Sequence, residues 1–503
     1  MIGPSRADRV AYSGAVRPAE DPGELRVGLD NHLPATLPVG RATAIFCFGH
    51  CFARHQRVAD LELLLDGVAH RPLATAMPRR DLYDSLAGGP ADPEGRSYRS
   101  GFWAALPVPA ASAPRTLALE AAVTLAGAAA TTVGLGSIRI AKPQQPDWRG
   151  PPIDDATIAV CMATFEPDLA LFEVQIESLL AQSDPRWVCA ISDDGTSEER
   201  FAAMVSMVSG DPRFVVSRAP ARAGPYLNFE RALQTAPARA RLLALCDQDD
   251  RWYPDKLATL RDALGSASLV YSDQRLVDRD HRVLRQSLWE GRRNDHRNLA
   301  SMLVANSVPG AAMLFTREVA DLALPFPEPP GFPFHDHWLA LVALAAGEIA
   351  YVDAPLYDYV QHLDAVSGDL VARPRAGRAQ RGWRAAYFAG YLGRKLQAQT
   401  LLLRCGPLLT ARKRRALQWF IGADHRPARF AWLAGRSLRR LIGRDETLGG
   451  EIPLVEGIIW RWLIRLASMP ARIPAHGRAD ASFPDPPLYE QPRLRRWRAG
   501  AGR

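Results

Sequence analysis

The hydrophobic positions follow two different patterns along the chain, and the first of them covers residues 26–141. Its apolar runs are short and are separated by Gly, Pro and Asp; they are Ala44–Phe52, Leu61–Asp66, Phe102–Val108, Thr116–Leu125 and Thr131–Ile140. Several short strands with turn residues between them predict a β-sandwich domain. The polar, Pro- and Gly-rich residues 1–25 predict a disordered N-terminus. The Pro-rich residues 142–156 predict a linker.

From Thr157 onward, apolar runs alternate with segments of helical period. The runs predict buried strands at Thr157–Ala163, Trp187–Ser192, Phe214–Ser217, Leu242–Cys246, Leu269–Ser272, Ser307–Phe315 and Ile349–Asp353. Between the first two runs, Phe172, Ile176 and Leu179 recur on one helical face. Strands that alternate with helices predict an α/β domain with a largely parallel sheet over residues 157–368.

The last part of the chain is rich in Arg, Ala and Leu. It predicts a helical basic region over residues 369–478 and a disordered basic tail over residues 479–503. From Val371 to Arg503 there are 27 Lys and Arg against 8 Asp and Glu, whereas the first 370 residues hold 35 against 46. A basic tail on a mildly acidic body predicts an anionic partner, either lipid or nucleic acid. The tail has no basic–aromatic motif of a known nucleic-acid reader, so we expect no nucleic acid.

One segment of the basic region, Val455–Met469, has a one-sided pattern. Arg461 and Arg465 lie on one helical face, and the opposite face carries Val455, Ile458, Ile459, Trp462, Leu463 and Leu466. This pattern has two interpretations. The segment is an interfacial helix by which residues 450–503 contact an anionic membrane surface, or it is a helix packed on the central domain.

Composition and cysteine usage limit the class of protein. Hydrophobic residues make up 47% and charged residues 23%, which is ordinary for a globular protein. Cys161, Cys189 and Cys246 lie inside apolar runs, which predicts buried free thiols in a reducing compartment. The sequence has no signal-peptide apolar region and no transmembrane-length apolar run, so we expect a cytoplasmic protein, with peripheral attachment to the inner face of the cell membrane as its second location.

A small cluster of cysteines and histidines lies in the front domain, at Cys47, His50, Cys51 and His55. These four side chains could ligate zinc, but structural zinc sites usually pair two knuckles across a longer loop. Four ligands on one strand and turn could hardly converge on one ion. We therefore favour a strand that ends in a turn.

Three carboxylates follow the buried run Leu242–Cys246, at Asp247, Asp249 and Asp250. Open α/β sheets bind ligands at the carboxyl ends of their strands. Carboxylates this close repel one another unless a cation or protonation relieves the charge. Because Mg²⁺ takes one or two protein carboxylates together with phosphate oxygens, the cluster predicts a metal–phosphate site. The alternative is a solvated acidic loop that caps the next helix.

Polar residues also follow other predicted strands, and we expect these strand ends to gather into one crevice. Thr164 follows the first strand, and Asp193 and Asp194 follow the second. The carboxylates of Asp193 and Asp194 would accept hydrogen bonds from a nucleotide. The alternative for these two aspartates is a turn with a helix cap.

A third group of polar residues follows the Pro-rich loop 325–333. Asp336 opens a predicted helix there, which suits a general base; the alternative is an ordinary helix N-cap. His362 is either a structural histidine or a ligand.

Several motifs occur in a fixed order through the central domain. They are Ala-Thr-Phe at 163–165, Ser-Asp-Asp-Gly-Thr at 192–196, Arg222 with Gly224 and Asn228-Phe229, CDQDDRWYPDKL at 246–257, Gly310, His335-Asp336, and YVQHLDAVSG at 359–368. In these residues the chain resembles family 2 glycosyltransferases of the GT-A fold, and among them the rhamnosyltransferase-like enzymes of bacterial surface polysaccharide synthesis. The resemblance covers residues 157–368, somewhat under half of the chain.

The resemblance implies a GT-A Rossmann-like domain and a role for each matching residue. Asp336 would be the catalytic base, and Asp249, Asp250 and His362 would lie at a Mg²⁺ or Mn²⁺ ion on the donor diphosphate. The residues that would bind the nucleotide sugar are Thr164, Glu166, Asp193, Asp194, Arg222, Asn228 and Asp247. His337 stands where the family often has an aromatic residue, a departure that bears on the substrates and not on the reaction class.

The implied activity is an inverting, metal-dependent transfer of a sugar from a nucleotide-diphosphate donor. The acceptor would be a hydroxyl of a growing bacterial surface glycan or of a lipid-linked molecule. One competing hypothesis is a metal-dependent nucleotidyltransferase, but the acidic segment 164–168 replaces the Gly- and Lys-rich loop that a triphosphate would need. The other is a non-catalytic glycan-binding scaffold, which the presence of all expected carboxylates disfavours.

Overall fold

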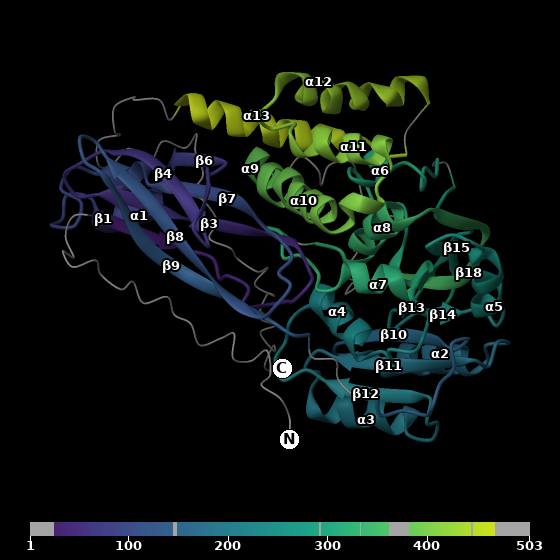
Figure 1. The fold of residues 1–503 in the computed structure, drawn as a ribbon. Helices are drawn as coiled ribbons and strands as arrows, with labels where there is room; N and C mark the ends of the chain where they lie inside the picture. Colours follow the sequence, from purple (N-terminus) through teal and green to yellow (C-terminus); the bar gives the residue numbers. More distant parts are fainter. Residues whose placement is uncertain are drawn as a thin grey trace, which may run out of the picture.

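The computed structural model describes residues 25–143, 148–290, 293–331, 333–361, 382–443 and 446–467. Three parts follow one another along the chain: a β-sandwich, an α/β domain and a layer of helices (Figure 1). This is the fold class predicted from the sequence, which is therefore confirmed.

The front part is built from two antiparallel-rich sheets. One sheet has the order β1 (Leu25–Leu29), β3 (Thr43–Ala53), β7 (Gly101–Val108) and β6 (Ala74–Met77). The other has the order β2 (Thr36–Pro38), β9 (Ala130–Ala141), β8 (Arg115–Leu125), β4 (Val58–Leu65) and β5 (Val68–His70). Along β8, buried and accessible residues alternate, so that Leu117, Leu119, Ala121 and Val123 enter the core between the sheets. A short helix, α1 (Arg80–Leu86), lies between β6 and β7 in the chain.

The central sheet of the α/β domain is mostly parallel at one side and mixed at the other. Its order is β12 (Phe214–Arg218), β11 (Trp187–Asp193), β10 (Ile158–Thr164), β13 (Leu242–Cys246), β17 (Met313–Thr316), β15 (Leu269–Asp278), β18 (Ile349–Gln361) and β14 (Arg251–Trp252), and β16 (Val283–Arg285) pairs with β15. Strands β10 to β13 run parallel, whereas β17 is antiparallel to both of its neighbours. The sequence-based strand Ser307–Phe315 was too long, because Gly310–Ala312 form a 3-10 turn and only β17 pairs with the sheet.

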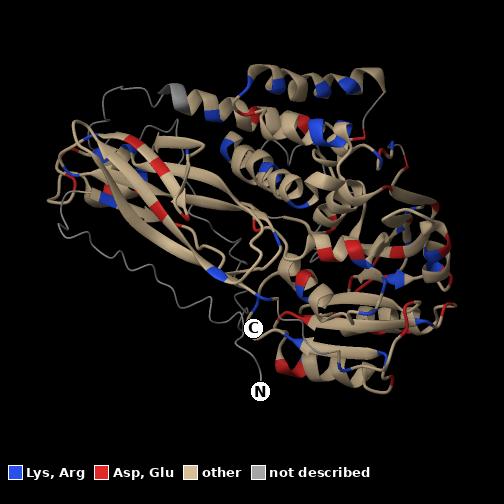
Figure 2. Cartoon of the chain, in the orientation of Figure 1, with Lys and Arg blue, Asp and Glu red and all other residues tan. Residues whose placement is uncertain are grey.

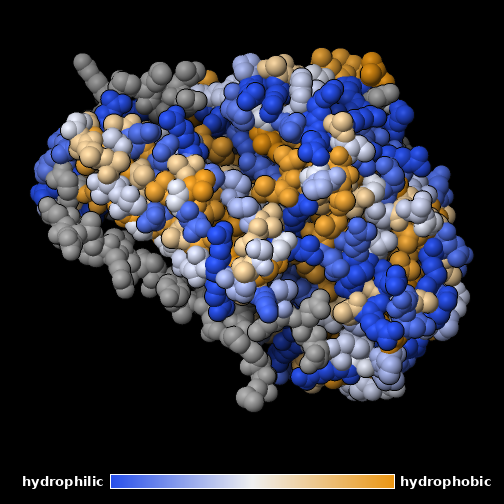
Figure 3. Space-filling model, in the orientation of Figure 1, coloured by the Kyte–Doolittle hydropathy of each residue, from blue (hydrophilic) through white to orange (hydrophobic). Residues whose placement is uncertain are grey.

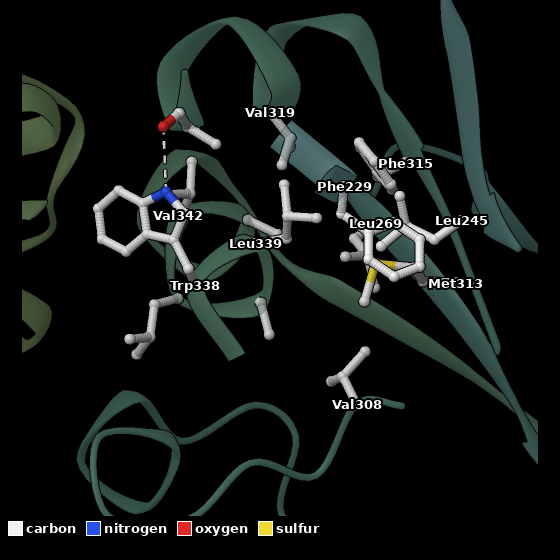
Figure 4. Packing of buried hydrophobic residues seen from close by; sticks show 14 of the residues in the cluster. Phe229, Leu245, Leu269, Val308, Met313, Phe315, Val319, Trp338, Leu339 and Val342 are labelled. Atoms are coloured by element: carbon white, nitrogen blue, oxygen red, sulfur yellow. Dashed lines mark hydrogen bonds between the residues drawn. The ribbon is translucent and has the colours of Figure 1, made fainter. Parts of the chain in front are cut away.

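Helices pack on this sheet and close a large core. They are α2 (Leu169–Leu180), α3 (Glu198–Val208), α4 (Pro225–Thr235), α5 (Lys256–Leu264), α6 (Leu299–Met302), α7 (Arg317–Ala323) and α8 (His335–Ala346). Helix α8 is apolar all round and is buried from His337 to Ala345, as expected of a helix inside a core. Figure 4 shows Leu339 of α8 facing residues of β13, β15 and β17. The Trp338 ring lies on the other side of α8, where its indole N–H donates to the Ala323 carbonyl at 3.0 Å.

The third part is a layer of helices that contacts both other parts. It consists of α9 (Trp383–Ala385), a π-helical segment (Ala386–Leu392), α10 (Gly393–Cys405), α11 (Ala411–Ile421), α12 (Pro427–Arg436) and α13 (Glu451–Ala467). Helix α10 lies along β3, where Ala44 N donates to Thr400 Oγ1 at 3.0 Å. Arg404 of α10 donates both to Ala42 O of the sandwich and to Ala323 O of the α/β domain, so one buried guanidinium joins three parts. Figure 2 shows that Lys and Arg are frequent in this layer.

Helix α13 packs on this layer and on the sandwich. Leu454 and Ile458 are buried, and so is Arg461, which donates to Asp424 O and to Leu73 O, both at 2.6 Å. Arg461, which the sequence pattern places on the face opposite the apolar one, is thus buried too, and backbone carbonyls satisfy its guanidinium inside the fold. Over the part of the chain that is described, none of the helices combines the length and hydropathy required to cross a bilayer.

Candidate active site

The carboxyl ends of three neighbouring strands meet at one edge of the sheet. In the parallel register Thr164 at the end of β10 is beside Asp193 of β11, and Asp193 is beside Arg218 of β12. Strand β13 ends on the other side of β10, so the segment that begins at Asp247 follows at the same edge. Gln248 joins the two loops, since its amide accepts from Phe165 N at 2.9 Å and donates to Phe165 O at 3.2 Å.

The paired carboxylates Asp193 and Asp194 each have partners inside the protein. Asp193 is fully buried and accepts from the backbone N–H of Gly195 and Thr196, at 3.2 and 3.1 Å. Asp194 accepts from Ala223 N at 2.7 Å and Gly224 N at 2.8 Å. Burial raises the pKa of Asp194. Asp193 thus builds its own turn, and Asp194 holds the loop that leads into α4.

The other residues predicted to bind the nucleotide sugar surround the end of β10. Asn228 is buried and donates to Thr164 O at 3.1 Å, while Ser192 Oγ donates to Asn228 Oδ1 at 2.6 Å. The Arg222 guanidinium lies 3.7 Å from the centre of the Phe165 ring. Glu166, whose φ is 43°, accepts from Ser197 N at 2.8 Å. Ser197 occupies the N-cap position of α3, but its hydroxyl donates to Glu166 and makes no cap hydrogen bond.

The three carboxylates after β13 have different surroundings. Asp247 and Asp249 are half-buried, whereas Asp250 is fully buried and accepts from Val360 N at 3.3 Å through one oxygen. The second oxygen of Asp250 is buried without a hydrogen-bond partner. Burial, reinforced by neighbouring carboxylates, raises the pKa of Asp247 to about 7 and that of Asp250 well above its usual range. A nearby positive charge would therefore stabilise the ionised form of these carboxylates.

A buried lysine supplies part of that charge. Lys256, in the first turn of α5, is inaccessible to solvent and donates to Ala311 O at 2.5 Å. Its Nζ lies 3.7 Å from the Trp252 ring centre and 4.1 Å from that of Tyr357. Burial lowers the pKa of Lys256 to about 7, against the opposing effect of Asp250 and Asp247.

Lys256 is not among the site residues predicted from the sequence. A signal was available, since Lys256 lies four residues before Leu260 and hence on the buried face of the helix.

Asp336 faces the acidic cluster from the start of α8. The N-cap position of α8 is Phe334, so the alternative interpretation of Asp336 as an N-cap is wrong. Burial raises the pKa of Asp336 to about 7, although hydrogen bonds from His337 N, the Asn306 side chain and Gly310 N act in the opposite direction. Asp336 also raises the pKa of Asp247, which places the two carboxylates within electrostatic reach of each other. A carboxylate poised near neutral pH suits proton transfer.

The turn Gly310–Ala312 fits closely against the start of α8. A Cβ on Gly310 would lie 3.0 Å from His335 Nε2, which is crowded, and 3.5 Å from Asp336 Cβ, which is an ordinary contact. His335 is stacked on Phe229 with ring centres 3.8 Å apart, and burial lowers its pKa to about 3. His337 points elsewhere: it is buried, and its Nε2 lies 2.6 Å from Met302 O.

The acidic cluster has features that suit a divalent ion. The unpartnered oxygen of Asp250 and the half-buried Asp247 and Asp249 supply hard oxygen donors. Within the described ranges, the structure brings no three Asp, Glu, His or Cys side chains together as a complete ligand set. Mg²⁺ and Mn²⁺ sites on nucleotides need only one or two protein carboxylates, because phosphate oxygens and water supply the rest. The remaining predicted ligand, His362, lies outside the described residues.

Comparison with known proteins gives one family match. Residues 160–322 match the family described as "Glycosyl transferase family 2". The Uncharacterized protein y4gI of Sinorhizobium fredii is 31% identical over 121 residues, which make up 23% of this chain and 13% of that protein. The chain thus spans well under two thirds of the length of this relative.

Similarity to solved structures is more remote. Residues 1–349 of TarS from S. aureus, in complex with UDP-GlcNAc, are 13% identical with a TM-score of 0.39, over 61% of this chain and 92% of that chain. The mannosyltransferase PcManGT of Pyrobaculum calidifontis, in complex with GDP-Man and Mn²⁺, is 15% identical with a TM-score of 0.33, over 63% of this chain and 91% of that chain.

Proposed function

We propose that the protein, whose residues 160–322 match glycosyl transferase family 2, is an inverting, metal-dependent glycosyltransferase of the GT-A fold. It moves a sugar from a nucleotide-diphosphate donor to a hydroxyl of a growing bacterial surface glycan or of a lipid-linked acceptor. The observation that carries this proposal is the pair of groups at one sheet edge: the acidic cluster 247–250 and, facing it, Asp336 with a pKa raised to about 7.

Asp336 is the proposed general base. Its carboxylate takes the proton from the acceptor hydroxyl as the hydroxyl oxygen attacks the anomeric carbon. The bond between that carbon and the nucleoside diphosphate breaks in the same displacement, so the configuration inverts. The hydrogen bonds from His337 N, Asn306 and Gly310 N fix the carboxylate in place, and one base suffices because no glycosyl-enzyme intermediate is formed.

The acidic cluster is the proposed site of the divalent ion. Asp249 and Asp250, with Asp247 nearby, would hold Mg²⁺ or Mn²⁺. His362 is predicted from the sequence to lie at the same ion. A divalent ion supplies charge neutralisation for a departing diphosphate. The role of this chain is to keep the carboxylates together, and the Lys256 ammonium group beside Asp250 and Asp247 lowers their mutual repulsion.

The nucleotide sugar would lie over the ends of β10 and β11. Thr164, Asp194 and Asn228 form one hydrogen-bonded group there, with Asp193 inside its turn and Glu166 at the rim. Arg222 is exposed on the Phe165 ring and offers a cation to the donor phosphates. A rhamnosyl or other hexosyl donor remains the prediction from sequence.

The experiment that tests this function is a calorimetric titration of the full chain with UDP-, GDP- and dTDP-sugars, with and without Mn²⁺. We expect one donor to bind in the presence of the ion only. Asp249→Ala should remove the metal-dependent binding, and Asp336→Asn should retain it while transfer is lost. A folded protein that binds none of these donors, or an Asp249→Ala variant with unchanged metal dependence, would contradict the proposal.

Membrane attachment is the second part of the proposal, and the structure changes the residues that carry it. Of the two interpretations of the segment Val455–Met469, the structure favours packing, since Leu454 and Ile458 of α13 are buried. Large hydrophobic side chains are exposed just before it, at Leu438, Leu441 and Ile442. Figure 3 shows hydrophobic residues at the surface over α12, which directly precedes this segment. We assign contact with an anionic membrane to residues 437–442, together with the basic tail.

A further inference from the structure

A cavity opens on the α/β domain at residues outside the candidate active site. It has a volume of about 650 Å³ and lies between the segment after β16 and the first residues of β18. Trp289, His296 and Tyr351 form its walls, and Glu290 and Asp353 lie at its rim. Its residues take no part in the donor, metal or base sites described above.

The walls of this cavity are aromatic. The Tyr351 ring is 4.9 Å from the Tyr271 ring, 5.7 Å from the His296 ring and 6.5 Å from the Trp289 ring, centre to centre. The Trp289 and Tyr351 planes are nearly perpendicular, at 83°. Such flat, rigid surfaces contact the C–H faces of a ring-shaped ligand at low cost in conformational entropy.

The same cavity contains polar groups that the protein leaves unsatisfied. Both ring nitrogens of His296 are buried and have no hydrogen-bond partner. Burial lowers the pKa of His296 to about 4, so at neutral pH the ring offers one donor and one acceptor. A buried polar group without a partner is costly. Both nitrogens are covered in the structure, and a turn of the imidazole ring toward the cavity would let a ligand supply the partner.

The charges around the cavity select the ligand class. Glu290 and Asp353 bring carboxylates, and no Lys or Arg lines the cavity among the residues that the structure describes. A phosphate-bearing ligand would be repelled, whereas carboxylates accept well from hydroxyl groups. Aromatic faces, a neutral imidazole and carboxylates together suit an uncharged polyhydroxylated ring.

We propose that this cavity binds an uncharged sugar unit of the acceptor glycan. The assignment rests on the proposed glycosyltransferase function and adds to it the chemical class of the acceptor. Specificity for the acceptor would then depend on Trp289, His296 and Tyr351, and not on the residues that hold the donor.

Pairings and hydrogen bonds along β15 and β18 link the walls of the cavity to residues near the acidic cluster. Tyr271 of β15 pairs with Tyr351 of β18, and two residues further along β15 Asp273 accepts from Leu288 N at 3.1 Å. The next residue, Gln274, accepts a hydrogen bond from the hydroxyl of Tyr357, whose ring lies over Lys256. Residues of β15 and β18 therefore contribute to the surroundings of both sites.

The test uses saturation-transfer NMR on the full chain with methyl glycosides of glucose, galactose, mannose, rhamnose and N-acetylglucosamine as probes. We expect at least one glycoside to bind the wild type. His296→Leu removes both ring nitrogens at similar volume and should weaken that binding about tenfold, the loss of roughly one buried hydrogen bond. Asp353→Asn, at the rim, is a second variant that does not disturb the core. His70→Leu, on the sandwich, is the matched control and should bind like the wild type.

Binding that persists unchanged in both His296→Leu and Asp353→Asn would overturn the proposal, as would the absence of binding by every glycoside. Displacement of the bound glycoside by UDP would also overturn it, because the cavity would then be a nucleotide site. Titration of the same samples with donor nucleotides and Mn²⁺ separates the two proposals. A failed acceptor cavity leaves donor binding intact, whereas a failed glycosyltransferase function abolishes donor binding in the wild type itself.

Discussion

At the scale of single residues, the acidic cluster depends on one buried cation. Asp250 is fully buried, keeps one oxygen without a hydrogen-bond partner and lies in the electrostatic field of Lys256, which is itself fully buried. Neither group could be buried so completely with a full charge and no counterpart. The two residues should therefore be coupled energetically.

Lys256→Met tests this coupling. The variant leaves the buried carboxylates without their cation, and we expect unfolding to become easier by about 3–5 kcal/mol. Adding Asp250→Asn to Lys256→Met should restore much of the lost free energy of unfolding, since the buried side chain at position 250 is then neutral. Denaturant unfolding of the two single variants and the double variant measures the interaction as a cycle. Additive effects in the double variant would exclude the coupling.

Asp336 has a pKa raised to about 7, and this predicts two pH dependences with definite signs. A base must be deprotonated, so kcat/KM should rise with pH and level off above about 7. Asp336→Asn should reduce the rate by about 10²–10⁴-fold at pH 8. A rate profile that is flat between pH 5 and 8, or an active Asn variant, would rule out this base.

The same carboxyl affects stability in the opposite sense. Its proton is held more tightly in the folded state than in the unfolded chain, where the pKa is about 4. As pH rises from about 4 to about 7, the free energy of unfolding of the wild type should therefore fall relative to that of Asp336→Asn, and then stay level. Melting temperatures of both proteins across this range measure the difference.

At the scale of elements, the site depends on how closely the turn Gly310–Ala312 approaches the start of α8. Lys256 holds this turn through Ala311 O, and Gly310 lies against His335 and Asp336. Helix α5, the turn Gly310–Ala312 and the start of α8 are far apart in sequence, and together they position the Asp336 carboxylate. The stacking of His335 on Phe229 leaves the imidazole little room to move away.

Gly310→Ala should displace this arrangement. The added Cβ would lie 3.0 Å from His335 Nε2, and we expect kcat to fall roughly tenfold or more, because small displacements of a catalytic group are costly. Gly134→Ala is the matched control, since a Cβ there meets nothing within 4 Å. Adding His335→Ala to Gly310→Ala should recover part of the rate. If Gly310→Ala and Gly134→Ala have the same kcat, the turn does not position the base.

At the scale of the whole molecule, the helical layer binds the sandwich to the α/β domain and also presents a hydrophobic segment to solvent. Leu441 and Ile442 are 81% and 73% exposed, next to helices that are rich in Arg. Exposed aliphatic side chains near clustered arginines are typical of a surface that contacts anionic lipid.

Leu441→Asp combined with Ile442→Asp should reduce co-sedimentation with vesicles of phosphatidylglycerol and phosphatidylcholine at least tenfold. Each introduced carboxylate removes apolar contact and repels the anionic surface. Val283→Asp combined with Leu284→Asp is the control, because these residues of β16 are also exposed and hydrophobic but lie on the α/β domain. Equal retention of vesicle binding by both double variants would refute the assignment.

The sequence alone determined the order of the parts and the chemistry of the site. Short apolar runs separated by turn residues predicted the strands of the sandwich, and strands alternating with helices predicted the α/β sheet, because these patterns are local consequences of burying each element. The strand ends at Thr164 and Asp193 meet as expected, since parallel neighbours end at the same edge. The acidic cluster was also visible in sequence, because three carboxylates in four residues need no fold to be near one another.

Only the tertiary structure decided which of these groups are buried, and with which partners. Lys256 and Arg461 are residue types usually found at the surface. Both lie inside the fold because carbonyl oxygens of distant segments accept hydrogen bonds from them. The cavity of Trp289, His296 and Tyr351 combines residues up to 62 positions apart, and no local pattern marks it. Burial and long-range contacts depend on how the elements pack, and that information is not contained in the period or composition of any one segment.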